Sequence, residues 1–265
     1  MGIVNVTPDS FAESESTIEP ARVVEAALEL EAQGADLLDV GGESTRPGAE
    51  PLSVEDELTR VLPVLRALGA RARVPISVDT YKAEVARRAL DLGASLLNDV
   101  SGLHYDPELA RVAAERGAGL IVMHTRGRPK TMYADARYED VVKEVAAELR
   151  ASVAAAREAG VPRERILIDP GIGFAKRPEH SYGVLARLAE IAEAVGQPVL
   201  VGPSRKSFLR DALDGRPAPD RDWGTAAAVA AAVLAGAHIV RVHAVAAMVQ
   251  VVRVAEEIRR QSRIA

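Results

Sequence analysis

Short apolar runs recur along the chain, and each ends in a polar or charged residue or in a glycine-rich turn that carries several. They are rich in Ile, Val and Leu and lack strict alternation, which is typical of strands that are covered on both faces. Their polar ends lie, in chain order, at Asn5, Asp39–Thr45, Asp79, Asn98, His124, Asp169, Lys206 and His243. Helical character fills the intervals, at residues 20–33, 53–69, 81–92, 106–117, 138–159, 179–195, 222–236 and 245–261. Eight such strand–helix units predict an α/β fold, a single (β/α)8 (TIM) barrel with its active site at the carboxyl ends of the strands.

Local signals support these helix boundaries. Ser53 precedes Asp56, and Asp106 precedes Pro107, so both polar residues are predicted to cap a helix. Glycines are expected to end six helices, at Gly34, Gly69, Gly93, Gly117, Gly160 and Gly196. The length of 265 residues matches the size of one barrel, about 250 residues, and no linker divides the chain. We therefore expect one barrel domain over residues 1–265.

Composition narrows the class of protein. The hydrophobic fraction of 48% is ample for a core, which must be aliphatic because aromatic residues make up only 3%. The net charge of −5 argues against a basic surface that would bind nucleic acid, and the lack of cysteine excludes disulfides and thiol chemistry. No apolar run approaches the ~20 residues of a membrane span, and the amino end lacks signal-peptide features. We expect a cytoplasmic protein; its abrupt start on a predicted strand is what loss of a short leader would produce.

Polar residues at three strand ends offer the clearest candidate chemistry. Asp79, Asn98 and Asp169 should project toward one mouth of the barrel, where they can bind a flat heterocycle that bears several N–H groups. The two carboxylates could equally form an acid/base couple or a hard-metal site. Each residue alone could also cap the following helix.

Cationic groups follow the last two strands. The segment GPSRKSF (202–208) contains Arg205 and Lys206, which could bind an anion, form a Schiff base through the lysine, or be solvated on a loop. Arg241 and His243 alternate on the last strand and so face one side, where they suit phosphate oxygens. A salt bridge from Arg241 to a core carboxylate is the competing interpretation.

Three connections on the predicted catalytic side are long, at residues 7–20, 41–53 and 125–138, and are expected to be substrate loops. The second contains Thr45, Arg46 and Pro47, which indicate either an anion-contacting loop or an ordinary turn. Asn5, just after the first strand, is a weak metal ligand and suits Mg²⁺ only where substrate phosphates supply most of the oxygens. Met123 is expected to pack against the pocket.

Taken together, these segments resemble the dihydropteroate synthase family of the folate pathway. The match follows the family's order in MGIVNVTPDSF (1–11), DVGGESTRPGAE (39–50), SVDTYK (77–82), NDVSG (98–102), MH (123–124), PKTM (129–132), DPGIGFAK (169–176), GPSRKSF (202–208) and RVH (241–243). GGESTRPGA and SRKS are highly specific, whereas NDVSG alone is weak. The sequence departs from the family's usual pattern at residues 12–15, at 125–128 and at Ala244, and none of these positions is assigned to catalysis.

The resemblance implies a (β/α)8 barrel that condenses 6-hydroxymethyl-7,8-dihydropterin diphosphate with p-aminobenzoate, with Mg²⁺ as cofactor and a homodimer as the assembly. It implies catalytic roles for Asp79, Asp169 and Lys206. The implied pterin site is Asp79, Asn98, Val100, Met123, Asp169, Gly202 and Lys206. The implied diphosphate site is Asn5, Arg46, Arg241 and His243, with Asn5 also the metal position. The implied p-aminobenzoate site is Phe11, Thr45, Pro47, Phe174 and Ser207.

The implied roles leave Asp39 structural and give His124 a supporting place. Three other classes of protein could share part of this pattern. A corrinoid-dependent pterin methyltransferase would share the barrel and the Asp/Asn positions but not the TRPGA and SRKS segments together. A catalytically silent homologue would usually lose one of the polar strand ends. A Schiff-base aldolase would form a trappable adduct on Lys206.

Overall fold

Eight parallel strands form the centre of the molecule in the computed structural model, which describes residues 1–7, 19–46, 48–134 and 136–262. The strands are β1 (Gly2–Asn5), β2 (Leu38–Gly41), β3 (Ile76–Asp79), β4 (Leu96–Asp99), β5 (Gly119–Met123), β6 (Ile166–Asp169), β7 (Leu200–Val201) and β8 (Ile239–Val240). The first six pair in chain order, and β7 pairs with β8. Parallel bridges from Ile168 to Val199 and from Gly2 to Val242 join the two sheets at both edges. The ring is therefore closed, and the predicted barrel is confirmed.

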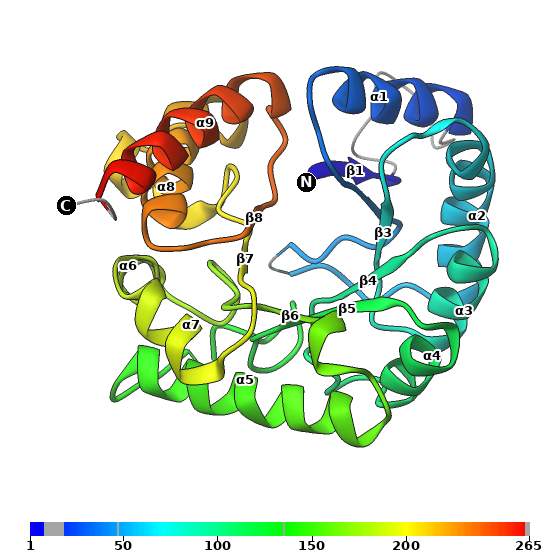
Figure 1. Ribbon diagram of the computed structural model, residues 1–265, viewed down its shortest axis with the longest axis horizontal. Helices are drawn as coiled ribbons and strands as arrows, with labels where there is room; N and C mark the ends of the chain where they lie inside the picture. The colour runs from blue at the N-terminus through cyan, green and yellow to red at the C-terminus, as the bar shows by residue number, and fades with distance from the viewer. Residues whose placement is uncertain (8–18, 47, 135, 263–265) are drawn as a thin grey trace.

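Helices surround the strands as an outer ring (Figure 1). They are α1 (Pro20–Ala32), α2 (Val54–Arg71), α3 (Ala83–Asp91), α4 (Glu108–Arg116), α5 (Val141–Glu158), α6 (Pro178–Ala186), α7 (Leu188–Val195), α8 (Asp222–Leu234) and α9 (Val245–Ser262). Every predicted helical stretch contains a helix. One prediction was wrong in detail: residues 179–195 form two helices, because the backbone leaves the helical region at Arg187, with φ −115° and ψ 28°. In the described residues, no helix combines the length and the apolar character that a bilayer crossing requires.

Helix ends follow the capping chemistry read from the sequence, with one exception. Ser53 accepts a hydrogen bond from the Asp56 backbone N–H at 3.0 Å. Asp106 accepts one from the Glu108 N–H at 3.2 Å, and its other carboxylate oxygen accepts the first N–H of α3 at 2.8 Å. Gly69 was predicted to end a helix but lies inside α2, where a side chain would meet the Leu92 carbonyl oxygen at 2.6 Å. That glycine permits close packing of backbone instead.

Alternation along the strands builds a layered interior. Residues such as Leu38, Val40 and Val78 face outward into an apolar cluster with the helices. The inward positions near the amino ends form an apolar floor, made of Met1, Leu37, Leu96, Ile121, Leu167, Leu200 and Ile239. Side chains two residues further along a strand point the same way, so the polar strand ends lie directly above this floor. The interior is apolar at this floor and polar at the carboxyl mouth, where substrates of this fold class bind.

Candidate active site

Arg241, on the segment that follows β8, crosses the barrel to the carboxylates of β2 and β3. Its Nε lies 2.5 Å from an oxygen of Asp39, and its Nη2 lies 2.8 Å from an oxygen of Asp79. The same Asp39 oxygen accepts a hydrogen bond from the Asn98 amide at 3.0 Å. The salt bridge offered as the competing role of Arg241 is therefore present, and Asp39 is structural as expected. The diphosphate role of Arg241 stays a prediction.

Burial sets the protonation of Asp79. Loss of water around this carboxyl raises its pKa to about 7, although the positive charge of Arg241 lowers it. The negative charge of Asp39 adds to the increase. Asp79 thus lies near the point at which it can either accept a hydrogen bond as a carboxylate or hold a proton at neutral pH.

Asp169, at the end of β6, has different partners. One oxygen accepts the Gly171 backbone N–H at 2.7 Å. Burial raises the pKa of Asp169, and the charge of Lys206 opposes that shift. The Lys206 ammonium donates to the Ile172 carbonyl at 2.5 Å and lies 4.3 Å from the centre of the Phe174 ring.

Electrostatic coupling shows that these groups converge. Burial lowers the pKa of Lys206 to about 8, and the charges of Asp169, Arg241 and Asp79 all act on it. Asp79 pairs in register with Asn98, as Met123 does with Asp169. The mouth therefore offers two carboxylates, an amide and an ammonium above an apolar floor, a set that suits a flat heterocycle with several N–H donors.

An apolar wall flanks the polar set. Val100 and Met123 form a small cluster with Tyr81, and Tyr105 and Phe174 pack against it. The rings of Tyr81 and Tyr105 meet edge to face, with centroids 5.0 Å apart. The sequence pointed to Val100, Met123 and Phe174 through the family resemblance but not to the two tyrosines, although Tyr81 lies two residues after the end of β3.

His243 is held by Ser204. The Ser204 hydroxyl lies 2.9 Å from His243 Nδ1, and it also accepts the His243 backbone N–H at 3.2 Å. Burial lowers the pKa of His243 to about 4, and the charges of Arg205, Arg241 and Arg46 act in the same direction. His243 is therefore a neutral hydrogen-bonding group at pH 7, and Arg46, itself exposed, lies close enough to affect it.

The neighbouring cations Arg205 and Lys206 have separate roles. Arg205 adopts a left-handed backbone conformation, with φ +58°. Its guanidinium forms a two-pronged salt bridge with Asp222 on α8, both distances being 2.8 Å. The turn sends Arg205 to α8 and Lys206 into the mouth, so the two cations have different partners, and anion binding by this segment stays a prediction. Gly202 borders the lysine: a side chain there would lie 3.8 Å from its ammonium.

The remaining predicted residues lie at the rim or outside the described residues. Asn5 ends β1, paired with Gly41. Thr45 is half-buried, and Ser207 is exposed at the start of a short 3-10 turn. Phe11 and Pro47 lie outside the described residues. Across the described part of the chain, no group of three His, Asp or Glu side chains could hold a metal ion, so a Mg²⁺ ion at Asn5 would need oxygens from substrate and water.

Sequence reasoning missed two buried lysines beside the mouth. Lys82 donates to Glu57 at 2.5 Å and also to Glu43, which accepts the Tyr81 hydroxyl at 2.8 Å. These contacts tie the loop after β2 to the end of β3. Both lysines lie inside segments already singled out, SVDTYK and DPGIGFAK.

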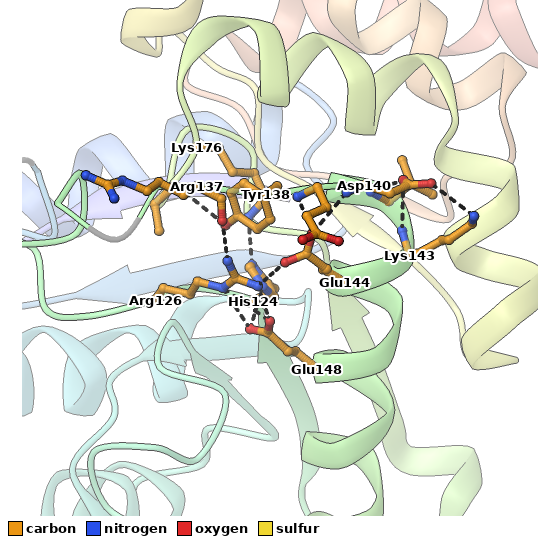
Figure 2. Close-up of polar contacts among 12 residues, drawn as sticks. His124, Arg126, Arg137, Tyr138, Asp140, Lys143, Glu144, Glu148 and Lys176 are labelled. Atoms are coloured by element: carbon orange, nitrogen blue, oxygen red, sulfur yellow. Dashed lines mark hydrogen bonds and ion pairs between the residues drawn. The ribbon is translucent and has the colours of Figure 1, made fainter.

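The second lysine, Lys176, is 1% exposed and lies in the network of Figure 2. Its ammonium lies 2.7 Å from His124 Nδ1, and His124 Nε2 lies 3.0 Å from Glu148. Burial lowers the pKa of His124 to about 4, and the charge of Lys176 lowers it further. His124 thus links the end of β5 to α5, and its supporting role at the site stays a prediction.

Three comparisons with known proteins agree. The family described as "Pterin binding enzyme" matches residues 1–243. A dihydropteroate synthase of Synechocystis is 45% identical over 260 residues, which cover 98% of this chain and 90% of that protein. The structure of dihydropteroate synthase from Xanthomonas albilineans with 4-aminobenzoic acid has 41% identity, a TM-score of 0.91 and coverage of 97% and 92%. That from Burkholderia cenocepacia, complexed with 7,8-dihydropteroate, has 41% identity, a TM-score of 0.88 and coverage of 100% and 92%.

Proposed function

This chain belongs to the pterin-binding enzyme family, within it to the dihydropteroate synthases, and we propose on that premise how its residues carry the reaction. It is a transferase of folate biosynthesis that joins 6-hydroxymethyl-7,8-dihydropterin diphosphate to p-aminobenzoate. The observation that carries the residue assignment is the convergence of two strand-end carboxylates, Asp79 and Asp169, with Lys206.

The pterin ring is proposed to bind above the apolar floor. Asp79, Asn98 and Asp169 accept from its N–H and amino groups, while Lys206 donates to a ring acceptor. Their shared position at the mouth and the burial of both carboxyls support these roles. Val100 and Met123 form the wall, and Gly202 leaves room beside Lys206.

The diphosphate is proposed to bind at Asn5, Arg46, Arg241 and His243. His243 is neutral near pH 7, so it offers a hydrogen bond rather than a charge. Asn5 contributes one amide oxygen, which fits a Mg²⁺ ion that takes its other ligands from substrate and water. When bound, Mg²⁺ would stabilise the negative charge of the leaving diphosphate.

The reaction breaks the C–O bond to diphosphate first, and the bonding electrons leave with the phosphate oxygen. The methylene carbon left behind is a cation conjugated with the pterin, and Asp79 and Asp169 stabilise it. The neutral amine of p-aminobenzoate then forms the C–N bond and loses a proton. This amine needs correct positioning more than a strong base. Thr45, Phe174 and Ser207 are proposed to position it, with Phe11 and Pro47 from outside the described residues.

The test is product formation by the purified protein. We expect dihydropteroate and pyrophosphate in equal amounts when dihydropterin diphosphate, p-aminobenzoate and Mg²⁺ are all present, measured by chromatography and a coupled phosphate assay. Chelation of Mg²⁺ should stop both. A folded protein that makes no dihydropteroate would refute the assignment. Methyl transfer to a corrinoid protein would instead identify the rival pterin enzyme.

A homodimer is proposed for the assembly. Helices α8 and α9 pack side by side (Figure 1). They carry exposed apolar side chains, including Trp223 at 88% exposure and Val254 at 62%. Apolar surface of this kind favours a protein partner. Light scattering should give twice the chain mass of 28.1 kDa, and a monomer mass at micromolar concentration would contradict the proposal. A cytoplasmic location stays a prediction of the sequence.

A further inference from the structure

Three backbone carbonyls of the turn from Gly171 to Lys176, after β6, accept hydrogen bonds from side chains. The Ile172 carbonyl accepts from Lys206, and the Phe174 carbonyl accepts from Lys176 at 3.1 Å. The Ala175 carbonyl accepts the Tyr138 hydroxyl at 2.9 Å. A surface turn would normally leave such carbonyls to water. Here a side chain of the protein donates a hydrogen bond to each of these three carbonyls.

The backbone of this turn is strained, so its conformation depends on contacts with other segments. Gly171 and Gly173 have positive φ, and so does Ala175, with φ +47°. For a residue with a Cβ this conformation costs about 1–2 kcal/mol. Gly171 also has no room for a side chain, because a Cβ would lie 1.9 Å from the His124 carbonyl oxygen. Without outside contacts the turn would relax toward other conformations.

Lys176 supplies the central contact. Its ammonium lies between the Phe174 carbonyl and His124 Nδ1, at 3.1 Å and 2.7 Å, and is closed off from solvent. The His124 backbone N–H in turn donates to the Asp169 carbonyl at 2.8 Å. Lys176 therefore joins the end of β5 to the turn that follows β6.

The hydrogen-bond partners of His124 determine which ring nitrogen carries its proton. The Glu148 carboxylate can only accept, so the ring proton of His124 lies on Nε2, and Nδ1 is left to accept from Lys176. Glu148 is an anion, with a pKa held at about 2: burial raises that pKa, but the hydrogen bonds from His124 and Arg126 lower it more. Burial lowers the pKa of Lys176 to about 7, and as ammonium or as amine the side chain keeps N–H groups to donate. Lys176 is thereby linked through a neutral ring to a fixed carboxylate.

The network returns to the same turn by a second route. Arg126, paired with Glu148, stacks its guanidinium 4.1 Å from the centre of the Tyr138 ring. The Tyr138 hydroxyl then donates to the Ala175 carbonyl. Figure 2 shows Lys176, His124, Glu148, Arg126 and Tyr138 as one connected group. Two contacts from this group, one at Phe174 and one at Ala175, thus fix the turn.

We propose that Lys176 is a positioning residue for the second substrate, because through this closed network it fixes the turn that presents Phe174 to p-aminobenzoate. This inference rests on the proposed function. The pterin side depends on it less: Asp169 keeps the Gly171 N–H, and Lys206 counters the burial of Asp169 more strongly than Lys176 does.

The experiment is a comparison of Michaelis constants at pH 7. In Lys176→Met, which keeps the length of the side chain and removes its donors, we expect KM for p-aminobenzoate to rise about tenfold, as for loss of the hydrogen bond that holds the Phe174 carbonyl. The values of kcat and of KM for dihydropterin diphosphate should stay within about twofold, a split that general damage to the fold would not produce.

Two further variants keep the test decisive. Tyr138→Phe removes only the hydroxyl contact to Ala175 and should raise KM for p-aminobenzoate about threefold, even if Lys176→Met fails to fold. Lys143→Met removes a lysine that is 80% exposed on α5 and should change nothing. Unchanged KM for p-aminobenzoate in both test variants, or equal losses for both substrates, would overturn the inference alone. A wild-type protein that makes no dihydropteroate would overturn the proposed function with it.

Discussion

Asp79 and Asp169 end two strands of the same barrel, and burial raises the pKa of both, but their partners differ. Asp79 touches a cation directly, since the Arg241 guanidinium lies 2.8 Å away and also binds Asp39. Asp169 accepts a backbone N–H, and the charges of Lys206 and Lys176 act on it without a direct bond. At the end of β3 the carboxylate therefore forms a salt bridge with its cation, whereas at the end of β6 the carboxylate is bonded to a backbone N–H and interacts with its cations only through their charge.

This difference shows that a position at a strand end does not define a role. On the Asp79 side, the charge of Arg241 is balanced by Asp39 and Asp79, and these salt bridges hold the ends of β2, β3 and β8 together across the barrel. On the Asp169 side, Lys206 donates to a backbone carbonyl and faces an aromatic ring, so its charge is balanced only at a distance. Loss of the cation should thus affect mainly stability on the Asp79 side, where it is Arg241, and mainly activity on the Asp169 side, where it is Lys206.

The largest contrast is expected between Arg241→Met and Lys206→Met. Removal of Arg241 leaves two buried carboxylates without their cation, and we expect a loss of about 3 kcal/mol in the free energy of unfolding at pH 8. The loss should be smaller at pH 5, where Asp79 can take up a proton. Removal of Lys206 should change stability by less than about 1 kcal/mol while abolishing turnover, because its burial already lowers its pKa to about 8 and so disfavours the charge. Urea unfolding of both variants measures this, and equal losses would contradict the comparison.

Asp79→Asn should separate function from stability. The folded-state pKa of about 7 lies above the unfolded value of 3.8, so the folded protein holds a proton between these values that the unfolded chain releases. Wild-type stability therefore falls as pH rises through this interval. The variant has no such titration and should gain several kcal/mol on wild type between pH 4 and pH 8, about 1.4 kcal/mol for each pKa unit of the shift. At the same time kcat/KM should fall at least about 100-fold.

Unfolding curves across this pH range give the first result, and turnover gives the second. Asp91→Asn, at a surface salt bridge with Arg116, is the matched control and should show neither effect. Unchanged turnover in Asp79→Asn would make Asp79 purely structural. A stability difference that does not vary with pH would show that Asp79 does not titrate in this range.

The fold could be predicted almost completely because its signals are local. Apolar runs, polar strand ends and capping residues lie next to one another in the chain, and each follows from backbone geometry and burial. The break at Arg187 could not be predicted, since neither glycine nor proline marks it. Gly69 was placed at a helix end because close packing against Leu92, distant in sequence, leaves no local signal.

The site was predictable as a set of residues but not as a set of contacts. The sequence left open whether Arg241 binds phosphate or a core carboxylate, and only the folded barrel brings Asp39 and Asp79 to it. Lys82 and Lys176 were missed because their burial depends on partners from other segments, Glu57 for the first and His124 for the second. Family motifs contain these lysines, but spacing alone does not show that they are buried.

The smallest expected effect tests the rim of the Asp79 side, at Ser204. Its hydroxyl accepts the His243 backbone N–H and lies 2.9 Å from Nδ1. We expect it to donate its own proton to Nδ1, which leaves the ring proton of His243 on Nε2. Ser204→Ala should let this ring turn and raise KM for dihydropterin diphosphate about threefold, with KM for p-aminobenzoate unchanged. Nitrogen NMR shifts of the ring give a direct measurement. His238, whose Nδ1 accepts the Val199 N–H at 3.2 Å, is an internal control that should keep its tautomer. If His243 carries its proton on Nδ1 in the wild type, Ser204 does not orient it, and the rim would depend on Arg46 and Arg241 alone.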